Sequence, residues 1–174
     1  MGGSSLKDRL LSQRRILASY ALGLADEPTA AYDLVQECML RALSAARVPD
    51  DDAAFRTWLL RIMRNFHIDQ LRKSQRIDYV APEGLEDIEE YQGGEERFLD
   101  KLAVRLAFGR LTPLHREILT LVDILGLSYA EAAKVLDVPV GTVMSRVSRA
   151  RQVMLAMISD TNVVQLRTKR RERG

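Results

Sequence analysis

Residues 126–151 constrain the fold of this chain more than any other stretch. Ser128 is followed three residues later by Glu131, a spacing in which each side chain can satisfy a free backbone N–H at the start of a helix. Pro139 ends that helix, because proline disfavours helical geometry at the residue before it, and it suits the first turn of the next helix. The stretch therefore predicts two short helices joined by a tight corner.

The second of these helices has an apolar stripe opposite a polar, cationic face. The stripe repeats at a period of about 3.6 residues and consists of Val143, Val147, Ala150 and Met154. The remaining sides carry Thr142, Met144, Ser145, Arg146, Ser148, Arg149 and Arg151. A helix of this size and chemistry fits a DNA major groove. An ordinary solvated helix in an all-α bundle is the alternative interpretation.

Charge is distributed unevenly along the 174 residues. Residues 74–100 carry two basic and nine acidic side chains, whereas residues 101–174 carry thirteen basic and six acidic ones. Aromatic residues make up only 6% of the chain, and alanine, leucine and arginine are abundant, which favours helices over sheets. The pattern suggests two nucleic-acid-facing units and a connector that repels DNA.

Several classes of function lack support in the sequence. The single cysteine, Cys38, cannot form an internal disulfide and is interpreted as a small core residue. No Cys/His spacing indicates a metal site, and no catalytic or phosphate-loop constellation indicates an enzyme, so we expect neither metal nor cofactor. No apolar run approaches the roughly 20 residues needed to span a bilayer, and we expect a cytoplasmic protein without membrane insertion.

Residues 55–73 show the clearest helical periodicity. The predicted core stripe consists of Phe55, Trp58, Leu59, Ile62, Met63 and Phe66. Arg61, Arg64 and Arg72 are expected to point away from it together with Ile68, and Asn65 lies at its edge. Arginines along one exposed face can neutralise phosphates, although exposed arginines on a solvated helix are equally ordinary.

Other stretches also predict helices. Residues 30–46 place Asp33, Gln36, Glu37 and Arg41 on a polar side, and a loop with three aspartates follows at 47–52. Residues 95–110 predict a helix that ends at Gly109 and whose inward positions are Phe98, Leu99, Leu102 and Leu106, with Phe108 as a further candidate. The helix opened by Thr112 and Pro113 has a predicted stripe of Leu114, Ile118, Leu121, Val122 and Leu125.

Two parts of the chain resemble one protein family. Residues 111–151, with Gly126-Leu127-Ser128-Tyr129, Val138-Pro139-Val140-Gly141-Thr142-Val143 and Ser145-Arg146-Val147-Ser148-Arg149-Ala150-Arg151, closely resemble region 4 of bacterial extracytoplasmic-function (ECF, group 4) sigma factors of the sigma-70 family. Residues 55–73 resemble regions 2.3 and 2.4, and residues 33–42 resemble region 2.2.

The resemblance implies a role for each stretch. Region 4 of the family binds the promoter −35 element, which assigns to it Thr142, Met144, Ser145, Arg146, Ser148, Arg149 and Arg151. Region 2 holds the melted −10 strand, which assigns to it Arg61, Arg64 and Arg72, with Asn65 lining a pocket for an extruded base. Asp33, Gln36, Glu37 and Arg41 correspond to the helix that docks on the polymerase β′ clamp helices.

The implied partners are core RNA polymerase, through its β′ clamp helices and β flap, promoter DNA and an anti-sigma factor. The free protein is expected to be a monomer. Two departures stand out. Met144 occupies a position where relatives often carry lysine or arginine, and the 47–54 loop is longer and more acidic than is common, which leaves open whether it reads a −10 base. A free-standing, LuxR-like helix-turn-helix regulator is the alternative function.

The predicted fold class is therefore all-α, with two small helical domains joined by an acidic flexible linker. We expect a region 2 domain at residues 6–74, the acidic linker at 75–96, a region 4 helix-turn-helix domain at 97–160 and a basic, disordered tail at 161–174.

Overall fold

The computed structural model describes the backbone of residues 5–74 and 95–171, and the side chains of residues 5–73 and 102–159. Within these ranges the chain is helical and contains no strand, which confirms the all-α prediction. The elements in order are α1 (Leu6–Leu24), α2 (Pro28–Leu43), α3 (Asp52–Ser74), α4 (Glu95–Gly109), α5 (Pro113–Leu119), η1 (Thr120–Ile124), α6 (Tyr129–Leu136) and α7 (Val140–Arg171). Most of the predicted acidic linker, residues 75–94, lies outside the described residues.

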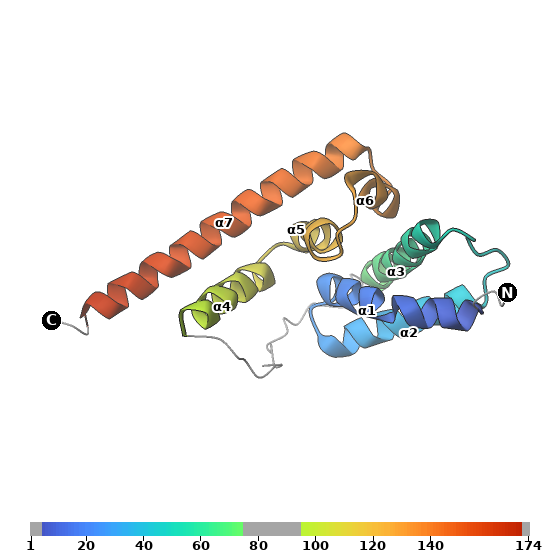
Figure 1. Cartoon of the computed structure of the whole chain (residues 1–174), viewed down its shortest axis with the longest axis horizontal. Coiled ribbons are helices and arrows are strands. Elements are labelled where there is room, and N and C mark those ends of the chain that lie inside the picture. The colour runs from blue at the N-terminus through green and yellow to red at the C-terminus, as the bar shows by residue number, and fades with distance from the viewer. Residues whose placement is uncertain (1–4, 75–94, 172–174) are drawn as a thin grey trace.

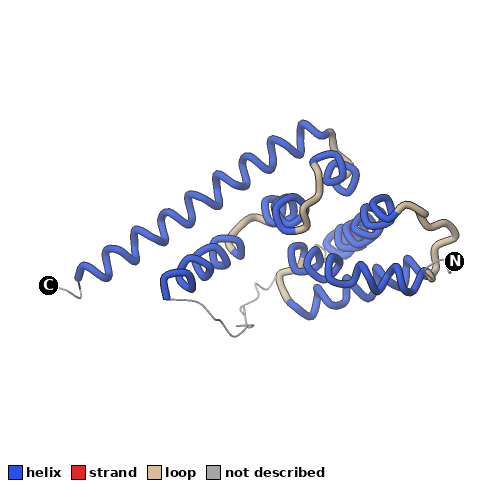
Figure 2. Tube along the Cα trace, in the orientation of Figure 1, coloured by secondary structure: helices blue, strands red, loops and turns tan. Residues whose placement is uncertain are grey.

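The helices form an N-terminal bundle, α1 to α3, and a C-terminal unit, α4 to α7 (Figure 1). In this view helix α7 runs diagonally from the lower left to the top of the molecule, with α4 and α5 beneath it. Figure 2 shows short loops between α1 and α2 and between α6 and α7, whereas a longer loop joins α2 to α3. The bundle and the unit also touch, because α3 contacts α6 and α1 contacts α5 and η1.

The core of the N-terminal bundle matches the predicted periodicity. Its largest wholly buried side chains include Tyr20, Leu17, Leu34, Phe55, Leu59 and Met63. Cys38 is wholly buried, and its Sγ lies 3.4 Å from the backbone oxygen of Leu59. Burial raises the pKa of the Cys38 thiol to about 12, so the group stays protonated and behaves as a core residue, as expected.

The helix that begins at Pro113 changes from α-helical to π-helical geometry after seven residues, about two turns. Thr112 caps its start by accepting from the His115 N–H, and at Thr120 the chain enters the π-helical segment η1. A π turn adds a residue and rotates the faces that follow. The predicted regular stripe is therefore only partly correct: Ile118 and Leu121 are buried, whereas Leu114 is exposed.

Two further expectations differ from the structure. On α4 the small residues Ala103 and Ala107 are buried, while Leu102 and Leu106 are more than a third exposed, because α7 packs close against the alanine side. The side chains of Phe98 and Leu99, also predicted to point inward, lie outside the described residues. Helix α7 continues to Arg171, through most of the segment expected to be a disordered tail. Residues 155–171 contain neither glycine nor proline, so the sequence offers no break at which that helix would end.

Candidate nucleic-acid interface

The corner between α6 and α7 is built by local sequence signals. Ser128 accepts from the Glu131 N–H at 3.2 Å, and the Glu131 carboxylate accepts from the Ser128 N–H at 2.8 Å, which completes the predicted capping box. These bonds to Ser128 lower the pKa of Glu131, with help from Arg56. Asp137 ends α6 in the left-handed conformation at φ 56°, a geometry that aspartate tolerates, and α7 begins three residues later.

The first turns of α7 carry the predicted −35 face. Val143, Val147 and Ala150 are at most 1% exposed and pack inward, as the periodicity predicted. The opposite side exposes Met144, Ser145, Ser148 and Arg149 to solvent, and Thr142 and Arg146 are half-buried at its flanks. The helix thus presents a small polar and cationic surface held by a packed seam, the form needed to enter a major groove.

Arg151 differs from the other residues predicted to face DNA. Its guanidinium donates to both carboxylate oxygens of Asp123, at 2.5 and 3.1 Å, and these bonds raise the pKa of Arg151. Asp123 belongs to the π-helical segment η1. A bidentate pair of this kind holds the guanidinium in one orientation, so Arg151 ties α7 to η1 instead of standing free beside Arg149.

Helix α3 carries the four residues predicted to hold the −10 strand, but they lie in different surroundings. Asn65 and Arg72 are exposed, and Arg61 is half exposed. The side chain of Arg64 is only 18% exposed. The expectation that all three arginines share one open face is therefore wrong for Arg64, which turns toward the C-terminal unit.

Arg64 belongs to a buried polar cluster between the bundle and the C-terminal unit. Its Nε donates to Oε1 of Glu117 at 2.8 Å, and the Tyr20 hydroxyl donates to the same oxygen at 2.9 Å. Burial, reinforced by the Glu117 carboxylate, raises the pKa of Tyr20 well above its ordinary value. Tyr20 and Arg64 come from α1 and α3, whereas Glu117 comes from α5, so the cluster joins three helices.

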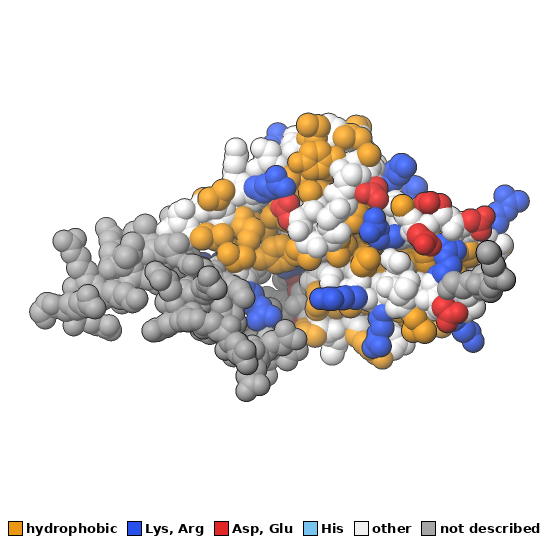
Figure 3. Space-filling view, viewed as in Figure 1, with side chains coloured by type: hydrophobic (Ala, Val, Ile, Leu, Met, Phe, Trp, Pro, Cys, Tyr) orange, Lys and Arg blue, Asp and Glu red, His pale blue; other side chains and the backbone are white. Residues whose placement is uncertain are grey.

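Further polar contacts cross the same boundary. Arg116 donates through Nε to the backbone oxygen of Gly23 at 3.0 Å and pairs with Asp26. The other pairs across the boundary are Arg56–Glu131 at 3.2 Å and Arg61–Asp137 at 3.7 Å. On the face shown in Figure 3, basic and acidic side chains alternate over the half that carries α1 to α3. This mixture of signs differs from a continuous basic field.

The predicted polymerase-facing side of α2 is solvent-accessible. Asp33 and Gln36 are exposed, while the Arg41 Nε donates to Glu37 Oε1 at 2.7 Å across one turn of the helix. The Arg41 guanidinium also lies over the Phe66 ring, 4.6 Å from its centroid. Arg41 is thereby fixed against α3, whereas Asp33 and Gln36 are exposed and accessible to a partner.

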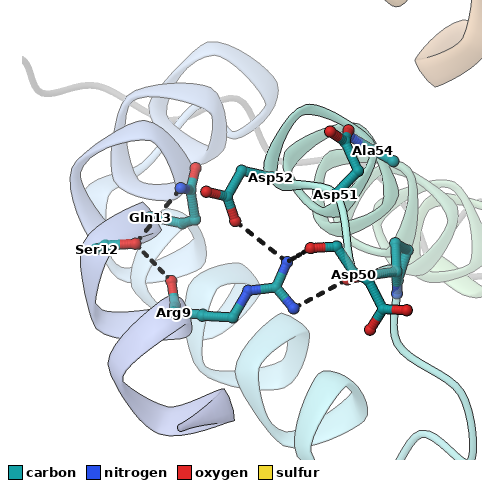
Figure 4. Close-up of polar contacts among 8 residues, drawn as sticks. Arg9, Ser12, Gln13, Asp50, Asp51, Asp52 and Ala54 are labelled. Carbon is teal, nitrogen blue, oxygen red and sulfur yellow. Dashed lines mark hydrogen bonds and ion pairs between the residues drawn. The ribbon is translucent and has the colours of Figure 1, made fainter. Parts of the chain in front are cut away.

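The loop between α2 and α3 is held by a residue that the sequence analysis did not identify. Arg9 donates to the backbone oxygens of Pro49 and Asp50, at 2.9 and 3.1 Å, and to Asp52 Oδ1 at 3.3 Å (Figure 4). Its guanidinium also lies 4.0 Å from the centroid of the Phe55 ring. No local pattern could reveal this role, because Arg9 and these partners are at least 40 residues apart.

The part of the chain that the structure describes holds no group of three metal-ligating side chains. No helix in that part is both long and apolar enough to cross a membrane.

Comparison with known proteins gives the family. The family model described as "Sigma-70 region 2" matches residues 10–77, and that described as "Sigma-70, region 4" matches residues 101–154. Among curated proteins, the ECF RNA polymerase sigma factor SigC of Mycobacterium tuberculosis is 43% identical over 128 residues, which are 71% of this chain and 68% of that protein. The ECF RNA polymerase sigma factor EcfG of Rhodopseudomonas palustris is 34% identical over 154 residues, covering 88% and 85%.

A solved structure shows the same likeness in three dimensions. The sigma factor RpoE from Bartonella quintana, in complex with the anti-sigma factor NepR, matches with a TM-score of 0.71 at 30% identity, covering 88% of this chain and 96% of that one. The chain therefore belongs to the sigma-70 family and is an ECF sigma factor. The resemblance inferred from the sequence is confirmed.

Proposed function

We propose that the exposed face of α7 reads the promoter −35 element in the major groove. The observation that supports this most directly is the polar surface around Ser145, Ser148 and Arg149, standing over a seam of fully buried valines. Arginine bonds guanine bidentately, whereas an apolar side chain such as Met144 can contact a thymine methyl. Thr142 and Arg146 lie at the edges of this surface, where phosphates flank the groove.

We propose that α3 holds the melted −10 strand. Asn65 and Arg72 are exposed on one side of the helix, and Asn65 has an amide suited to hydrogen-bond an unstacked base. Arg61 and Arg64 would add phosphate contacts once released from their acidic partners. Trapping an extruded base would stabilise strand separation.

The exposed side of α2 is proposed to dock on core RNA polymerase, with Asp33, Gln36 and Glu37 meeting the β′ clamp helices. The C-terminal unit would meet the β flap, for which exposed leucines on α4 and α5 offer an apolar surface. An anti-sigma factor is the proposed inhibitory partner, since the matched RpoE was solved with NepR. In this function the protein acts by recruitment in the cytoplasm, where the polymerase works, and catalyses no reaction itself.

We propose that each predicted segment of the chain has its own role. Residues 6–74 act as the region 2 domain and residues 97–160 as the region 4 domain. The acidic linker at 75–96 connects them, and the basic segment 161–174 adds nonspecific DNA affinity.

The test is transcription with purified core polymerase, with start sites mapped across the genome. The wild-type chain should direct initiation at a small set of promoters, whereas core enzyme alone should not. Arg149→Ala should weaken occupancy of these promoters by about 1–3 kcal/mol, the range for a lost base contact. Arg110→Ala, which removes an exposed arginine at the end of α4, should have no such effect.

Failure of the wild-type chain to redirect initiation would contradict the proposal. Operator binding by a dimer of the chain without polymerase would favour the alternative, a LuxR-like regulator. Equal losses for Arg149→Ala and Arg110→Ala would show that α7 does not read base edges.

A further inference from the structure

Arg151 lies at the border of the exposed face of α7. Met144, Ser148 and Arg151 follow one another at i, i+4 and i+7, a spacing that places them in one row along the helix. Met144 and Ser148 are exposed, whereas Val147, one turn before Arg151, belongs to the buried seam. Because the row runs between the exposed face and the seam, its arginine is placed to meet the sugar-phosphate backbone that flanks a major groove.

The guanidinium of Arg151 is fixed along one of its edges. Its Nε donates to Oδ2 of Asp123 at 3.1 Å, and its Nη2 donates to Oδ1 at 2.5 Å. These bonds raise the pKa of Arg151, and a weaker interaction with Tyr129 adds to the effect. The carboxylate therefore takes the edge formed by Nε and Nη2. It leaves the terminal edge, formed by Nη1 and Nη2, for a second acceptor such as a phosphate.

Asp123 is held in place by the π-helical segment η1. The Leu125 N–H donates to the Thr120 backbone oxygen at 2.9 Å, and the Leu127 N–H donates to that of Leu121 at 3.0 Å. The side chains of Thr120 and Leu121 are completely buried. The backbone that carries Asp123 is therefore fixed on the core, so its carboxylate can hold the guanidinium in one orientation.

Stability alone does not account for this pair. The side chain of Arg151 is 50% exposed and that of Asp123 is 37% exposed, and ion pairs open to water add little to stability. An aspartate beside a DNA-binding surface also repels phosphates. A role in orienting Arg151 accounts for both facts, because a side chain already held in its bound orientation loses less conformational entropy when DNA binds.

We propose that Asp123 is a positioning residue, which orients Arg151 so that its terminal edge binds a backbone phosphate at the border of the −35 element. The proposal rests on the proposed function, which assigns α7 to that element, and it adds a phosphate contact to the reading of bases. Asp123 itself contacts no DNA. Arg149 and its neighbours read base edges, whereas Arg151 fixes the position of α7 in the groove.

The first test uses Asp123→Asn, which keeps the shape of the side chain and removes its charge. If charge alone mattered, removing an acid near DNA would strengthen binding, whereas loss of positioning weakens it. The matched control is Asp137→Asn. Asp137 is a 79% exposed acid between α6 and α7, and asparagine tolerates its left-handed backbone. Binding of the holoenzyme to a duplex fragment of a mapped promoter is measured from about 0.05 to 0.2 M salt.

We expect Asp123→Asn to lower promoter affinity about fivefold near physiological salt, the contribution of one phosphate contact. The slope of log K against log salt should become shallower by about one. Asp137→Asn should bind at least as tightly as wild type and keep the wild-type slope. Unchanged or tighter binding by Asp123→Asn would overturn the proposal.

A second variant tests whether Asp123 acts through Arg151. Arg151→Ala should weaken binding more than Asp123→Asn does, because it also leaves the Asp123 carboxylate unpaired beside the phosphates. Adding Asp123→Asn to Arg151→Ala should then raise the affinity, so the effect of Asp123→Asn changes sign between the two backgrounds. An equal loss in both backgrounds would show that Asp123 acts independently of Arg151 and would contradict the proposal.

Base discrimination separates orientation of Arg151 from simple bracing of α7. Loss of a phosphate contact weakens binding about uniformly across sequences. Asp123→Asn should therefore keep the wild-type preference among fragments that carry single −35 base substitutions. A displaced α7 would lose that preference, and this result would also contradict the proposal.

Arg149→Ala separates failure of this inference from failure of the proposed function. If Arg149→Ala weakens binding and alters the −35 preference while Asp123→Asn binds like wild type, only the positioning role is wrong. If Arg149→Ala changes neither the affinity nor the preference of the holoenzyme, α7 does not read the −35 element. In that case the proposed function is wrong, and this inference fails with it.

Discussion

The two helices proposed to bind DNA differ in how their cationic side chains are held. On α7, Arg149 is exposed above a buried valine seam, and of the arginines predicted to face DNA there only Arg151 is paired with an acid, Asp123, in the part of the chain that the structure describes. On α3, Arg64 is enclosed with Glu117 and Arg61 is paired with Asp137. The same residue type at helical spacing therefore gives an open surface in one case and an interface in the other. Arginine content alone does not reveal which of the two a helix forms.

The largest expected difference between an interface arginine and an exposed arginine is in the free energy of unfolding. Arg64→Ala should lower the free energy of unfolding by about 3 kcal/mol, because it leaves the enclosed Glu117 carboxylate without its cation. Arg72→Ala, on the same helix but 77% exposed, should change it by less than about 0.5 kcal/mol. Urea unfolding followed by circular dichroism measures both. Similar losses for the two variants would show that Arg64 is not part of a buried contact.

A second effect concerns the loop that precedes α3. Arg9→Ala should destabilise the bundle by about 2 kcal/mol, since it removes hydrogen bonds from a charged donor to two loop carbonyls. Hydrogen exchange should quicken at residues 49–54. Arg15→Ala, an exposed substitution on the same helix, serves as control. Unaltered loop exchange in Arg9→Ala would show that the guanidinium does not hold the loop.

A third prediction concerns Asn65, which is exposed on α3. Asn65→Ala should leave closed-complex formation normal but reduce promoter melting about tenfold, the equivalent of about 1.4 kcal/mol and within the range for losing contacts to an unstacked base. Gln70→Ala, also exposed on α3, is the matched control. Permanganate footprints measure melting in the holoenzyme. A footprint of wild-type strength for Asn65→Ala would remove this residue from the −10 site.

The smallest effect is a dependence on pH. Burial lowers the pKa of His67 below its ordinary value near 6.5, although Glu117 and Asp26 oppose the shift while Arg116 and Arg64 support it. The unfolded chain therefore binds a proton more readily than the folded one, and stability falls as pH drops below about 6.5. His67→Gln should flatten this dependence in thermal unfolding between pH 7 and 5.5. An unchanged slope would exclude His67 as its source.

Local signals accounted for much of the fold. The Ser128–Glu131 capping box, the corner at Pro139 and the Val143–Val147 seam could all be predicted, because each depends on residues within two turns of one another. The π-helical segment at Thr120 could not, because its rotation is coupled to packing against α1. Nor could the inward alanines of α4, since only the approach of α7 decides which side of a weakly patterned helix is buried.

The candidate site shows the same division. Its residues on α7 could be predicted from periodicity, because they lie opposite the buried seam of Val143, Val147 and Ala150. The roles of Arg9, Arg116 and Glu117 could not be chosen, because the partners of each are more than 39 residues away in sequence. The sequence around a charged residue does not identify its partner when that partner lies on another helix.

The sequence by itself determined that this protein is helical and where its helix-turn-helix corner lies, because helix caps, proline breaks and apolar periods act over short distances. Its family followed from the resemblance of its motifs to regions 2 and 4, which the comparisons confirm. Only the tertiary structure decided which arginines are free. That choice depends on Gly23 allowing α1 to approach Thr120 and on Glu117 meeting Arg64, contacts between residues far apart in the chain. Short-range patterns determine where the helices form. Packing between the helices determines which of their charged side chains remain accessible to a partner.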